Sequence, residues 1–262
     1  MRALSTASTG MMAMELNVQV IANNLANMTT TGYKRQRVAF QDLLYDHVSR
    51  IGTQTSAQGN ILPVGIDLGS GVKTVGTPRL MTQGTLAQTG GTLDVAIRGD
   101  GFFKIQLPDG TYAYTRDGTF QMDNTGRIVS AQGNVVQPAI TIPNNSSGLT
   151  INPQGQVSVI PQGSTTPTIL GQLTITRFIN PTGLLPVGDN MYTETPASGT
   201  PQDGLAGTDG AGDVQQGNLE QSNVDSVTEI TNLIAAQRAY EMNGKVITAA
   251  DQMLQSDANL IR

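Results

Sequence analysis

The stretch LSTASTGMMAMELNVQVIANNLANM, residues 4–28, places an apolar side chain at alternating spacings of three and four residues. These spacings keep the apolar side chains on one face of a helix, and over more than three heptads they indicate a coiled-coil-like seam. The seam consists of Leu4, Ala7, Met11, Met14, Val18, Ile21, Leu25 and Met28. The sequence therefore predicts a long N-terminal helix, which Gly32 would end as the glycine that follows a helix C-terminus.

This predicted helix carries almost no charge outside its seam. Arg2 and Glu15 are the only charged residues before Lys34, and the other faces carry Ser, Thr, Asn, Gln, Ala and Met. A helix whose outer face contacts water usually carries many charged residues. We therefore expect this helix to be surrounded by other helices. The methionines among these residues would by default fill a core, and their adaptable side chains also suit a helix with several different neighbours.

Three asparagines, Asn23, Asn24 and Asn27, lie near the predicted end of this helix. One interpretation is local, because asparagine competes for backbone hydrogen bonds and loosens a helix end. The other is that the asparagines lie in a helix–helix layer and fix its register, since a buried amide must find a partner. The seam through Leu25 and the lack of charge around it favour the second interpretation.

The C-terminal region predicts a second helix of the same character, from Ser226 to Ile261. Ser226 and Glu229 have the spacing of a capping box, and cap-type residues Asn223 and Asp225 precede them. One apolar stripe begins with Val227, Ile230 and Ile234. A neighbouring stripe, interrupted by Asn243 and Asp257, comprises Leu233, Ala236, Tyr240, Ile247, Ala250, Leu254 and Ile261. We expect the two terminal helices to pair in one helical layer.

The residues between the helices show the period-two pattern and turn dipeptides of short antiparallel strands. Turn signals occur at Asp109-Gly110, Asp117-Gly118 and Thr125-Gly126. Further strands are predicted at Gln156–Ile160, Gln172–Ile179 and Asn190–Glu194, and a Gly- and Pro-rich return connection at residues 196–213. The segment Ser49–Val75 is too long for an ordinary loop of a compact domain.

The predicted fold class is α+β. Long N- and C-terminal helices pair as a coiled-coil-like bundle, and a central all-β domain of short antiparallel strands follows an extended segment. The predicted domains are residues 1–45 for the N-terminal helix and turn, 46–80 for the extended segment, 81–213 for the β domain and 214–262 for the C-terminal helix.

The composition excludes several functional classes. The net charge is −5 and no basic run exists, which argues against a nucleic-acid partner. Cysteine is absent, so the fold uses no disulfide and no thiolate. No run of 18 apolar residues predicts a membrane span. Ser, Thr and Gly interrupt the apolar residues at the N-terminus, so we expect any export to occur without a cleaved signal peptide.

Catalytic and ligand-binding motifs are weak in this chain. His47 is the only histidine, and neither an HExxH nor a GxSxG motif occurs. Two carboxylates would suffice for a glycosidase, and the candidates are Asp94, Asp100, Asp109, Asp117 and Asp123. Most of them precede Gly or Asn at turn positions, where Asp forms local hydrogen bonds. The GDGFF and PDGT stretches lack the Lys-Ser/Thr of a phosphate loop. We therefore predict no catalytic residue, cofactor, metal site or small-molecule substrate.

Three stretches of the chain resemble the flagellar rod and hook axial proteins. ANNLANMTTTGYK, residues 22–34, resembles the N-terminal motif of that family, and SNVDSVTEITNLIAAQRAYEMNGKVITAADQML, residues 222–254, resembles its C-terminal motif. LDVAIRGDGFFKIQLPDGTYAYTRDGTF, residues 93–120, is similar to the shared β region. Residues 40–80 resemble the extended segment of the distal-rod members, so a proximal-rod or hook-type protein is the alternative within the family.

The resemblance implies a structural, self-assembling subunit of the distal rod, a rigid shaft that crosses the periplasm and carries torque from motor to hook. It implies that the chain polymerises with itself and meets proximal rod proteins and the hook protein. It also implies contact with the surrounding peptidoglycan and outer-membrane ring proteins, and export through the flagellar type III apparatus. The expected location is the basal body of a bacterial flagellum.

The residues expected at subunit interfaces come from both terminal regions. They are Leu4, Met11, Met14, Val18, Ile21, Asn23, Asn24, Leu25, Asn27, Met28, Gly32, Tyr33, Asn223, Val224, Asp225, Glu229, Ile234, Arg238, Tyr240, Ile247 and Leu254. For Tyr33 and the following Lys34 an ordinary loop pair is the alternative interpretation. For the charged residues Asp225, Glu229 and Arg238 the alternative is a solvated helix face.

A function from another class stays open at this point. The central β domain could belong to a secreted module that binds cell-wall polysaccharide. Such a module needs an exposed aromatic platform, and the chain has five Phe, six Tyr and no Trp. Removing both termini separates the two hypotheses, because a binding module would keep its activity and a shaft protein would lose assembly.

Overall fold

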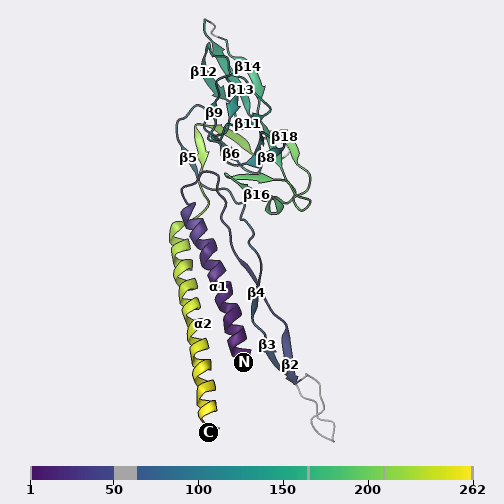
Figure 1. The fold of residues 1–262 in the computed structure, drawn as a ribbon. Coiled ribbons are helices and arrows are strands. Elements are labelled where there is room, and N and C mark those ends of the chain that lie inside the picture. The colour runs from purple at the N-terminus through teal and green to yellow at the C-terminus, as the bar shows by residue number, and fades with distance from the viewer. Residues whose placement is uncertain (1, 50–63, 164–165, 209, 261–262) are drawn as a thin grey trace. The chain divides into compact units, whose positions relative to one another are not determined.

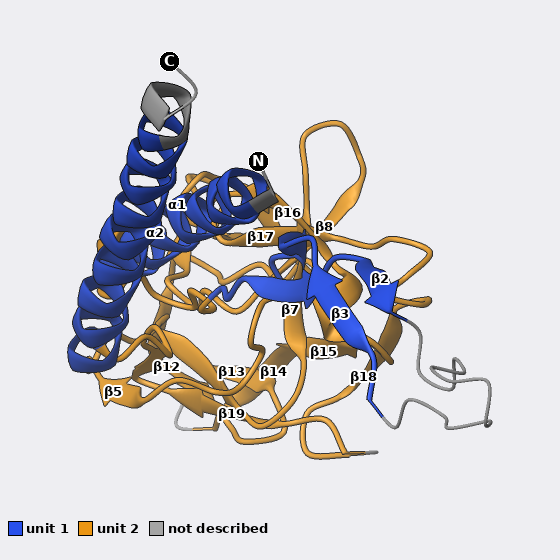
Figure 2. Cartoon of the chain, turned by 90° about the horizontal axis from the view of Figure 1, so that it is seen from below, with its two compact units in different colours: residues 1–25, 36–78, 226–262 blue, residues 26–35, 79–225 orange. Residues whose placement is uncertain are grey.

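The structure is a computed structural model that describes residues 2–49, 64–163, 166–208 and 210–260, and it divides into two compact units (Figures 1 and 2). Unit 1 comprises residues 1–25, 36–78 and 226–262, and unit 2 comprises residues 26–35 and 79–225. The helices lie in unit 1 and most strands lie in unit 2, so the predicted α+β class is confirmed. The observed β unit also includes residues 26–35 and extends to 225, beyond the boundary predicted at 213.

Two helices, α1 (Arg2–Ala26) and α2 (Ser226–Leu260), lie side by side in unit 1 (Figures 1 and 2). The prediction of α2 is confirmed up to Leu260, and Ile261 lies outside the described residues. The prediction that Gly32 ends the first helix is wrong, because α1 ends at Ala26. The backbone N–H of Gly32 donates instead to the carbonyl of Glu220 at 2.8 Å, so residues 27–32 turn into unit 2.

A two-stranded antiparallel ribbon forms the rest of unit 1. Strand β1 (Ala39–Asp42) pairs with β4 (Val72–Gly76), and β2 (Tyr45–Ser49) pairs with β3 (Ile66–Gly69). The predicted extension Ser49–Val75 therefore contains β3 and most of β4, while residues 50–63 lie outside the described residues. Most ribbon side chains are exposed, which is typical of a ribbon that lacks a core of its own.

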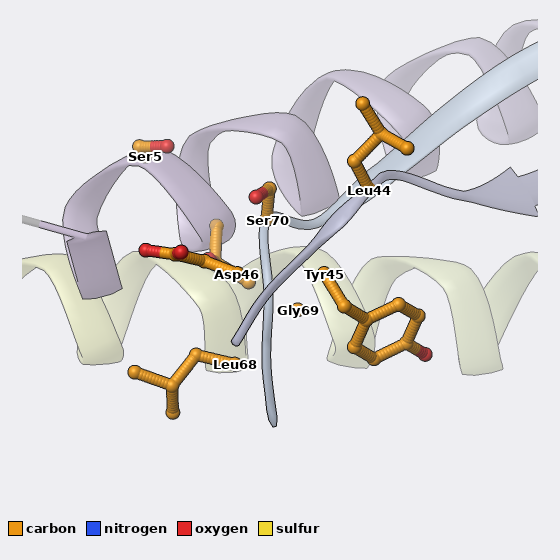
Figure 3. A pocket seen from close by; sticks show the side chains of 8 residues that line it. Ser5, Leu44, Tyr45, Asp46, Leu68, Gly69 and Ser70 are labelled. Atoms are coloured by element: carbon orange, nitrogen blue, oxygen red, sulfur yellow. The ribbon is translucent and has the colours of Figure 1, made fainter. Parts of the chain in front are cut away.

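The ribbon approaches α1 closely at one glycine. Gly71 has a φ of +119°, and a Cβ at this position would overlap the hydroxyl of Thr9. The next residue, Val72, donates its N–H to that hydroxyl at 3.4 Å. A pocket of about 360 Å³ lies beside this contact, and its lining includes Ser5 of α1 and Leu44 of the ribbon (Figure 3). Only a glycine allows the ribbon to pass α1 this closely.

The largest sheet of unit 2 has nine antiparallel strands. Its order is β16 (Leu185–Gly188), β17 (Met191–Thr193), β8 (Tyr112–Thr115), β7 (Phe102–Gln106), β11 (Val135–Gln137), β10 (Ile128–Val129) and β9 (Gln121–Met122). Strand β15 (Thr174–Arg177) pairs with β7 and with β18 (Gln202–Leu205). Strand β18 lies inside the predicted return connection, so the prediction of residues 196–213 as a linker is wrong in part.

Smaller sheets complete unit 2. Strands β12 (Ser146–Ile151), β13 (Gln156–Pro161) and β14 (Thr168–Gln172) form a three-stranded sheet. Strand β19 (Asp213–Gln216) pairs with β6 (Val95–Arg98), and β20 (Asn218–Glu220) pairs with β5 (Leu86–Gln88). A short 3₁₀ helix, η1, spans Pro181–Gly183. The pairing of β19 and β20 explains why the β unit extends past residue 213.

The core of unit 2 lies on both faces of β7. Phe103 belongs to a large aliphatic cluster and meets Phe120 edge to face, with the ring centroids 5.0 Å apart. The preceding residue, Phe102, faces a second cluster and contacts Phe178 and Tyr192 edge to face. Successive side chains of a strand point to opposite faces, so unit 2 covers both faces of this strand within a single chain.

The aspartates predicted at turns form local hydrogen bonds. Asp109, in the β7–β8 hairpin, accepts from the N–H and the hydroxyl of Thr111 at 2.9 and 2.6 Å. Asp117 accepts in the same way from Thr119, and Asp123 accepts from Thr125. Each of these carboxylates thus fixes its own turn, as an Asx turn does.

Candidate assembly interface

The two helices of unit 1 are antiparallel and meet at two places. A Cβ added to Gly10 of α1 would lie 2.9 Å from the amide nitrogen of Asn243 in α2. Further along, the amide of Asn24 donates to a carboxylate oxygen of Glu229 at 3.1 Å. Asn24 follows Gly10 by 14 residues, and Glu229 precedes Asn243 by the same 14. Fourteen residues are two heptads, so the same faces of both helices meet at each place.

The face of α1 that meets α2 carries small and polar side chains. Its buried residues are Ala7, Ala13, Val20, Ile21 and Asn24. Small side chains let helices approach closely, and Gly10 permits the contact with Asn243. The larger members of the predicted seam, such as Met11, Val18 and Leu25, are only half-buried. The observed contact face is therefore rotated slightly from the predicted seam, although Ala7 and Ile21 belong to both.

Asn24 has its hydrogen-bonding partners in the same chain. Its amide nitrogen donates to the carbonyl of Gln36 at 2.8 Å, and its oxygen accepts from the N–H of Gln36 at 2.9 Å. Together with Glu229, this arrangement ties α1, the start of the ribbon and α2 to one another. Asn24 and Glu229 are each 1% exposed. The buried amide of Asn24 thus has partners within a single copy, and its predicted role in the register between copies stays a prediction.

Away from its contact with α1, helix α2 carries large apolar side chains that are exposed. We call them together the outer face of α2, and they are Val227, Ile230, Ile234, Met242, Val246 and Met253. Val227 is 71% exposed and Ile234 is 46% exposed. In the stripe that contains Ala236 and Ala250, only these two alanines are buried among the described residues, while Tyr240 and Leu254 are exposed. A helix that is apolar on opposite sides is normally buried all round, so α2 carries more apolar surface than α1 can cover.

Residues 27–35 lie within unit 2, where a charged cluster holds them. The ammonium of Lys34 donates to one oxygen of Glu220 at 2.6 Å and to the carbonyl of Thr82 at 2.9 Å. The guanidinium of Arg116 donates to the other oxygen of Glu220 at 3.2 Å and to the carbonyl of Gly99 at 2.8 Å. The side chains of Lys34, Arg116 and Glu220 are at most 3% exposed. We call these three residues the buried charge cluster.

Burial dominates the electrostatics of this cluster. Removal from water lowers the pKa of Lys34. The attraction of the Glu220 carboxylate opposes this shift, and the repulsion of Arg116 adds to it. Burial also lowers the pKa of Arg116, and Glu220 opposes the shift. A buried charge is costly unless a charged partner and hydrogen bonds accompany it. The Glu220 carboxylate, with a smaller contribution from Asp100, therefore offsets the cost of burying two cations.

Residues close in sequence to Lys34 and Glu220 also have partners within unit 2. The amide of Asn223 donates to the carbonyl of Leu80 at 2.8 Å, and its oxygen accepts from the N–H of Arg35 at 2.7 Å. Gly32, with a φ of +67°, lies against the backbone of Arg116 and Asp117. Tyr33 is buried, and the guanidinium of Arg79 lies 6.0 Å from its ring centroid. Gly32 and Tyr33 are thus interior residues of unit 2 in one copy.

The predicted interface residues fall into three groups by exposure. Those buried within the chain are Ile21, Asn24, Gly32, Tyr33 and Glu229. Those half-buried are Leu4, Met11, Met14, Val18, Leu25, Asn27, Asn223, Val224 and Ile247. Those exposed, and so accessible to another molecule, are Asn23, Met28, Asp225, Ile234, Arg238, Tyr240 and Leu254.

Sequence reasoning missed two features of this region. Lys34, Arg116 and Glu220 lie far apart in the chain, and nothing in their local sequence distinguishes them from solvated charges. The contact of Gly10 with Asn243 had a weak signal, since a glycine inside a helix is unfavourable by ~1 kcal/mol relative to alanine. Such a glycine often has a packing reason, and here that reason is the close approach of α2.

Other kinds of site find little support in the described part of the chain. Neither α1 nor α2 has a described stretch that is apolar enough over a sufficient length to cross a membrane. Among the described residues, no three carboxylates or histidines gather where they could hold a metal ion. The feature that most needs a partner is therefore the outer face of α2.

Comparison with known proteins gives matches along most of the chain. Residues 4–34 match the family described as flagella basal body rod protein, and residues 96–159 match the D1 domain of the flagellar hook protein FlgE/F/G family. Residues 215–260 match the C-terminal region of flagellar basal body rod FlgEFG proteins.

Three similar proteins cover nearly all of the chain. A flagellar basal-body rod protein FlgG of Caulobacter vibrioides is 50% identical over 260 residues, which cover 99% of each chain. A FlgG of Buchnera aphidicola is 47% identical over 97% of each chain. A flagellar basal-body rod protein FlgF of Caulobacter vibrioides is 33% identical over 94% of this chain and 91% of its own. In that bacterium, identity is thus higher with FlgG than with FlgF.

Proposed function

The chain belongs to the FlgG family of flagellar basal-body rod proteins, and on this premise we propose that its two helices build the helical layer of a rigid, torque-carrying shaft. It is a structural subunit of the distal rod in the flagellar basal body. The fold gives each copy a self-contained β unit and a helical unit. In the proposal, the helical units of many copies join, and the β units remain separately folded.

The outer face of α2 is the single observation that carries this proposal. Each of its six large apolar side chains is at least 46% exposed in a single copy. Burial of apolar surface contributes about 25 cal/mol per Å², so covering these side chains with helices of other copies drives assembly. Isolated helices are marginal in water, and polymerisation would stabilise both α1 and α2.

The same proposal includes a coiled-coil-like pairing of α1 with α2. The two contacts, at Gly10 and at Asn24, are separated by two heptads on each helix. A heptad separation keeps two helices in register only when they supercoil slightly. The polar contact of Asn24 with Glu229 would set this register, as single polar residues do in coiled coils.

The ribbon has a proposed role in stiffening the shaft. Among its exposed apolar side chains, Leu44 is 87% exposed, and Tyr45, Val48, Ile66 and Leu68 are also exposed. These side chains would be covered if the ribbon lay along neighbouring copies. Deleting residues 49–75 should then give a more bendable filament, measured as a shorter persistence length by electron microscopy. An equally rigid filament would contradict this role.

Further partners follow from the place of the rod in the flagellum. We propose that the shaft crosses the periplasm, joins proximal rod proteins at one end and the hook protein at the other, and passes through peptidoglycan and outer-membrane rings. We also propose export by the flagellar type III apparatus. The chain has no catalytic role in this proposal, and its turn aspartates serve the structure of unit 2.

The alternative of a polysaccharide-binding module is less well supported. In the described part of unit 2, Tyr112 is the only aromatic side chain with a large exposed fraction, and Phe102, Tyr114, Phe178 and Tyr192 form a buried cluster. A stacking platform for sugars would require several exposed rings. A chain without both terminal helices should therefore fail to assemble and should also fail to bind cell-wall polysaccharide.

Electron microscopy and hydrogen exchange together test the proposed function. The purified full-length protein should form straight tubes. Backbone amides of α1 and α2 should exchange quickly in the monomer and slowly in the tubes, while amides of β7 and β8 should be protected in both. Equal protection of the helices in monomer and polymer, or the absence of tubes, would contradict the proposal.

A further inference from the structure

Four charged side chains in unit 1 have no partner among the described residues of a single copy. Glu15 of α1 and Arg238, Glu241 and Lys245 of α2 are all exposed. Within the residues that the structure describes, none of the four side chains forms an ion pair or a hydrogen bond. Two are acidic and two are basic. On helices with so few charges, this balance leaves equal numbers of opposite charges available for contacts between copies.

The two acidic residues lie in a groove between α1 and α2. The groove has a volume of about 550 Å³, and its lining consists of Glu15, Val18, Gln19, Gln237, Tyr240 and Glu241. Val18 and Tyr240 give it an apolar floor, while the two carboxylates make it negative. Covering an unpaired carboxylate with an apolar surface is strongly unfavourable. The groove therefore suits an occupant that brings both apolar side chains and positive charge.

The outer face of α2 has these two properties. Arg238 is four residues from both Ile234 and Met242, and Lys245 is three residues from Met242, so all four side chains lie on the same side of the helix. Arg238 and Lys245 are one heptad apart, which places them ~10 Å apart along the axis. We call Ile234, Arg238, Met242 and Lys245 the basic ridge. Glu241 of the groove borders this ridge, three residues from Arg238 and four from Lys245. The two cations of the ridge are opposite in sign to the two carboxylates of the groove.

We propose that the basic ridge of one copy docks into the acidic groove of a second copy, with Arg238 and Lys245 paired against Glu15 and Glu241. This inference rests on the proposed function, because it names the contact by which copies assemble. The occupant is a second copy, since the chain itself presents both complementary surfaces. Each copy gives its ridge to one neighbour and its groove to another. A contact between two different surfaces does not close on itself as a two-fold dimer does, and it can generate an open helical polymer.

Charge reversal on either surface tests the proposal. One variant carries Glu15→Lys and Glu241→Lys, so its groove and ridge are both positive. The other carries Arg238→Glu and Lys245→Glu, so its groove and ridge are both negative. Each variant alone would place like charges opposite each other, which costs several kcal/mol. We expect the critical concentration for polymerisation, measured by sedimentation, to rise about tenfold or more for each variant.

Mixing the variants is the decisive step. In an equimolar mixture, the positive ridge of one variant meets the negative groove of the other, and the reverse contact is also complementary. The mixture should therefore polymerise at a concentration close to that of the wild type. Asp251→Lys, which changes an exposed charge of α2 outside both surfaces, is the matched control and should assemble normally. Circular dichroism and hydrogen exchange of the β strands check that every variant is folded.

The outcomes separate this inference from the proposed function. Failure of the wild type to polymerise would contradict the proposed function itself. If the wild type polymerises and both reversed variants do so equally well, the ridge and groove are not the contact. If each variant fails alone and the mixture also stays monomeric, the pairing of ridge with groove is overturned, while self-assembly stands.

Discussion

Phe103 of β7 and Ile234 of α2 are both large apolar side chains, but Phe103 is fully buried and Ile234 is 46% exposed. The difference extends to the units that contain them. Unit 2 covers both faces of its central strand within one chain, whereas the side chains of the outer face of α2 in unit 1 stay at least 46% exposed among the described residues. In the proposed assembly, unit 2 is therefore stable in a single copy, and unit 1 gains stability from contacts with other copies.

The largest expected effect comes from truncating these two side chains. Phe103→Ala should lower the free energy of unfolding by about 3–5 kcal/mol, because it leaves a cavity in the core. Ile234→Ala should change the stability of the monomer by less than about 0.5 kcal/mol but should weaken polymerisation. Urea denaturation and sedimentation measure the two quantities. Similar losses of monomer stability in both variants would remove the distinction between the units.

The next effect concerns the buried charge cluster. Glu220→Gln should destabilise unit 2 by about 3 kcal/mol, because Lys34 and Arg116 would remain buried without their carboxylate. Arg98 and Asp213 form an ion pair at 2.7 Å on the surface of the same unit. Asp213→Asn is the matched control and should cost less than about 1 kcal/mol, because water screens an exposed pair. Equal losses in thermal or urea unfolding would show that the cluster does not secure the unit.

A smaller effect is expected where the chain enters unit 2 from α1. Gly32→Ala should destabilise the protein by about 2 kcal/mol, because a left-handed conformation is unfavourable for alanine. A Cβ would also lie 2.7 Å from the backbone nitrogen of Asp117. Gly110, with a φ of +85°, has open space around its missing Cβ, so Gly110→Ala should cost only about 1 kcal/mol. Equal costs in urea unfolding would argue against close packing at Gly32.

The smallest effect concerns pH and a turn of unit 2. A hydrogen bond from the Thr125 hydroxyl lowers the pKa of Asp123, and desolvation opposes this shift. The backbone N–H groups of Arg127 and Thr125 and the guanidinium of Arg127 lower the pKa of Asp123 further. Since its pKa is lower in the folded than in the unfolded state, the contribution is fully present above the unfolded pKa of about 4 and is lost as pH falls. Asp123→Asn should lower the melting temperature at pH 7, and the difference from wild type should shrink below pH 4. A difference that does not change with pH would contradict this.

The sequence predicted the helices better than their contact. Spacings of three and four residues indicate a helix from local information alone, and α2 follows the predicted bounds as far as the description extends. The contact face of α1 could not be predicted in the same way. Large residues such as Met11 and Val18 suggest a seam, but the helices meet through Ala7, Gly10 and Asn24, because small side chains and hydrogen-bonded amides allow closer approach.

The end of α1 and the buried charge cluster depend on long-range contacts. Gly32 has the local signature of a helix end, but its N–H bonds to β20, and the chain leaves the helix at Ala26. The burial of Lys34 depends on Glu220, which lies 186 residues away. No local pattern of residues reports such a pairing, because it arises only when the sheets of unit 2 bring the segments together.

The distance along the chain between Lys34 and Glu220 has a consequence for the order of events during synthesis. The ribosome incorporates Lys34 early, and Glu220 is the 186th residue added after it. At ~5–20 residues per second, this interval lasts ~10–40 s. During this interval strand β20 is not yet available to pair with residues 26–35. The Glu220 carboxylate is also not yet available to Lys34 and Arg116. Unit 2 therefore cannot be completed before Glu220 has been synthesised.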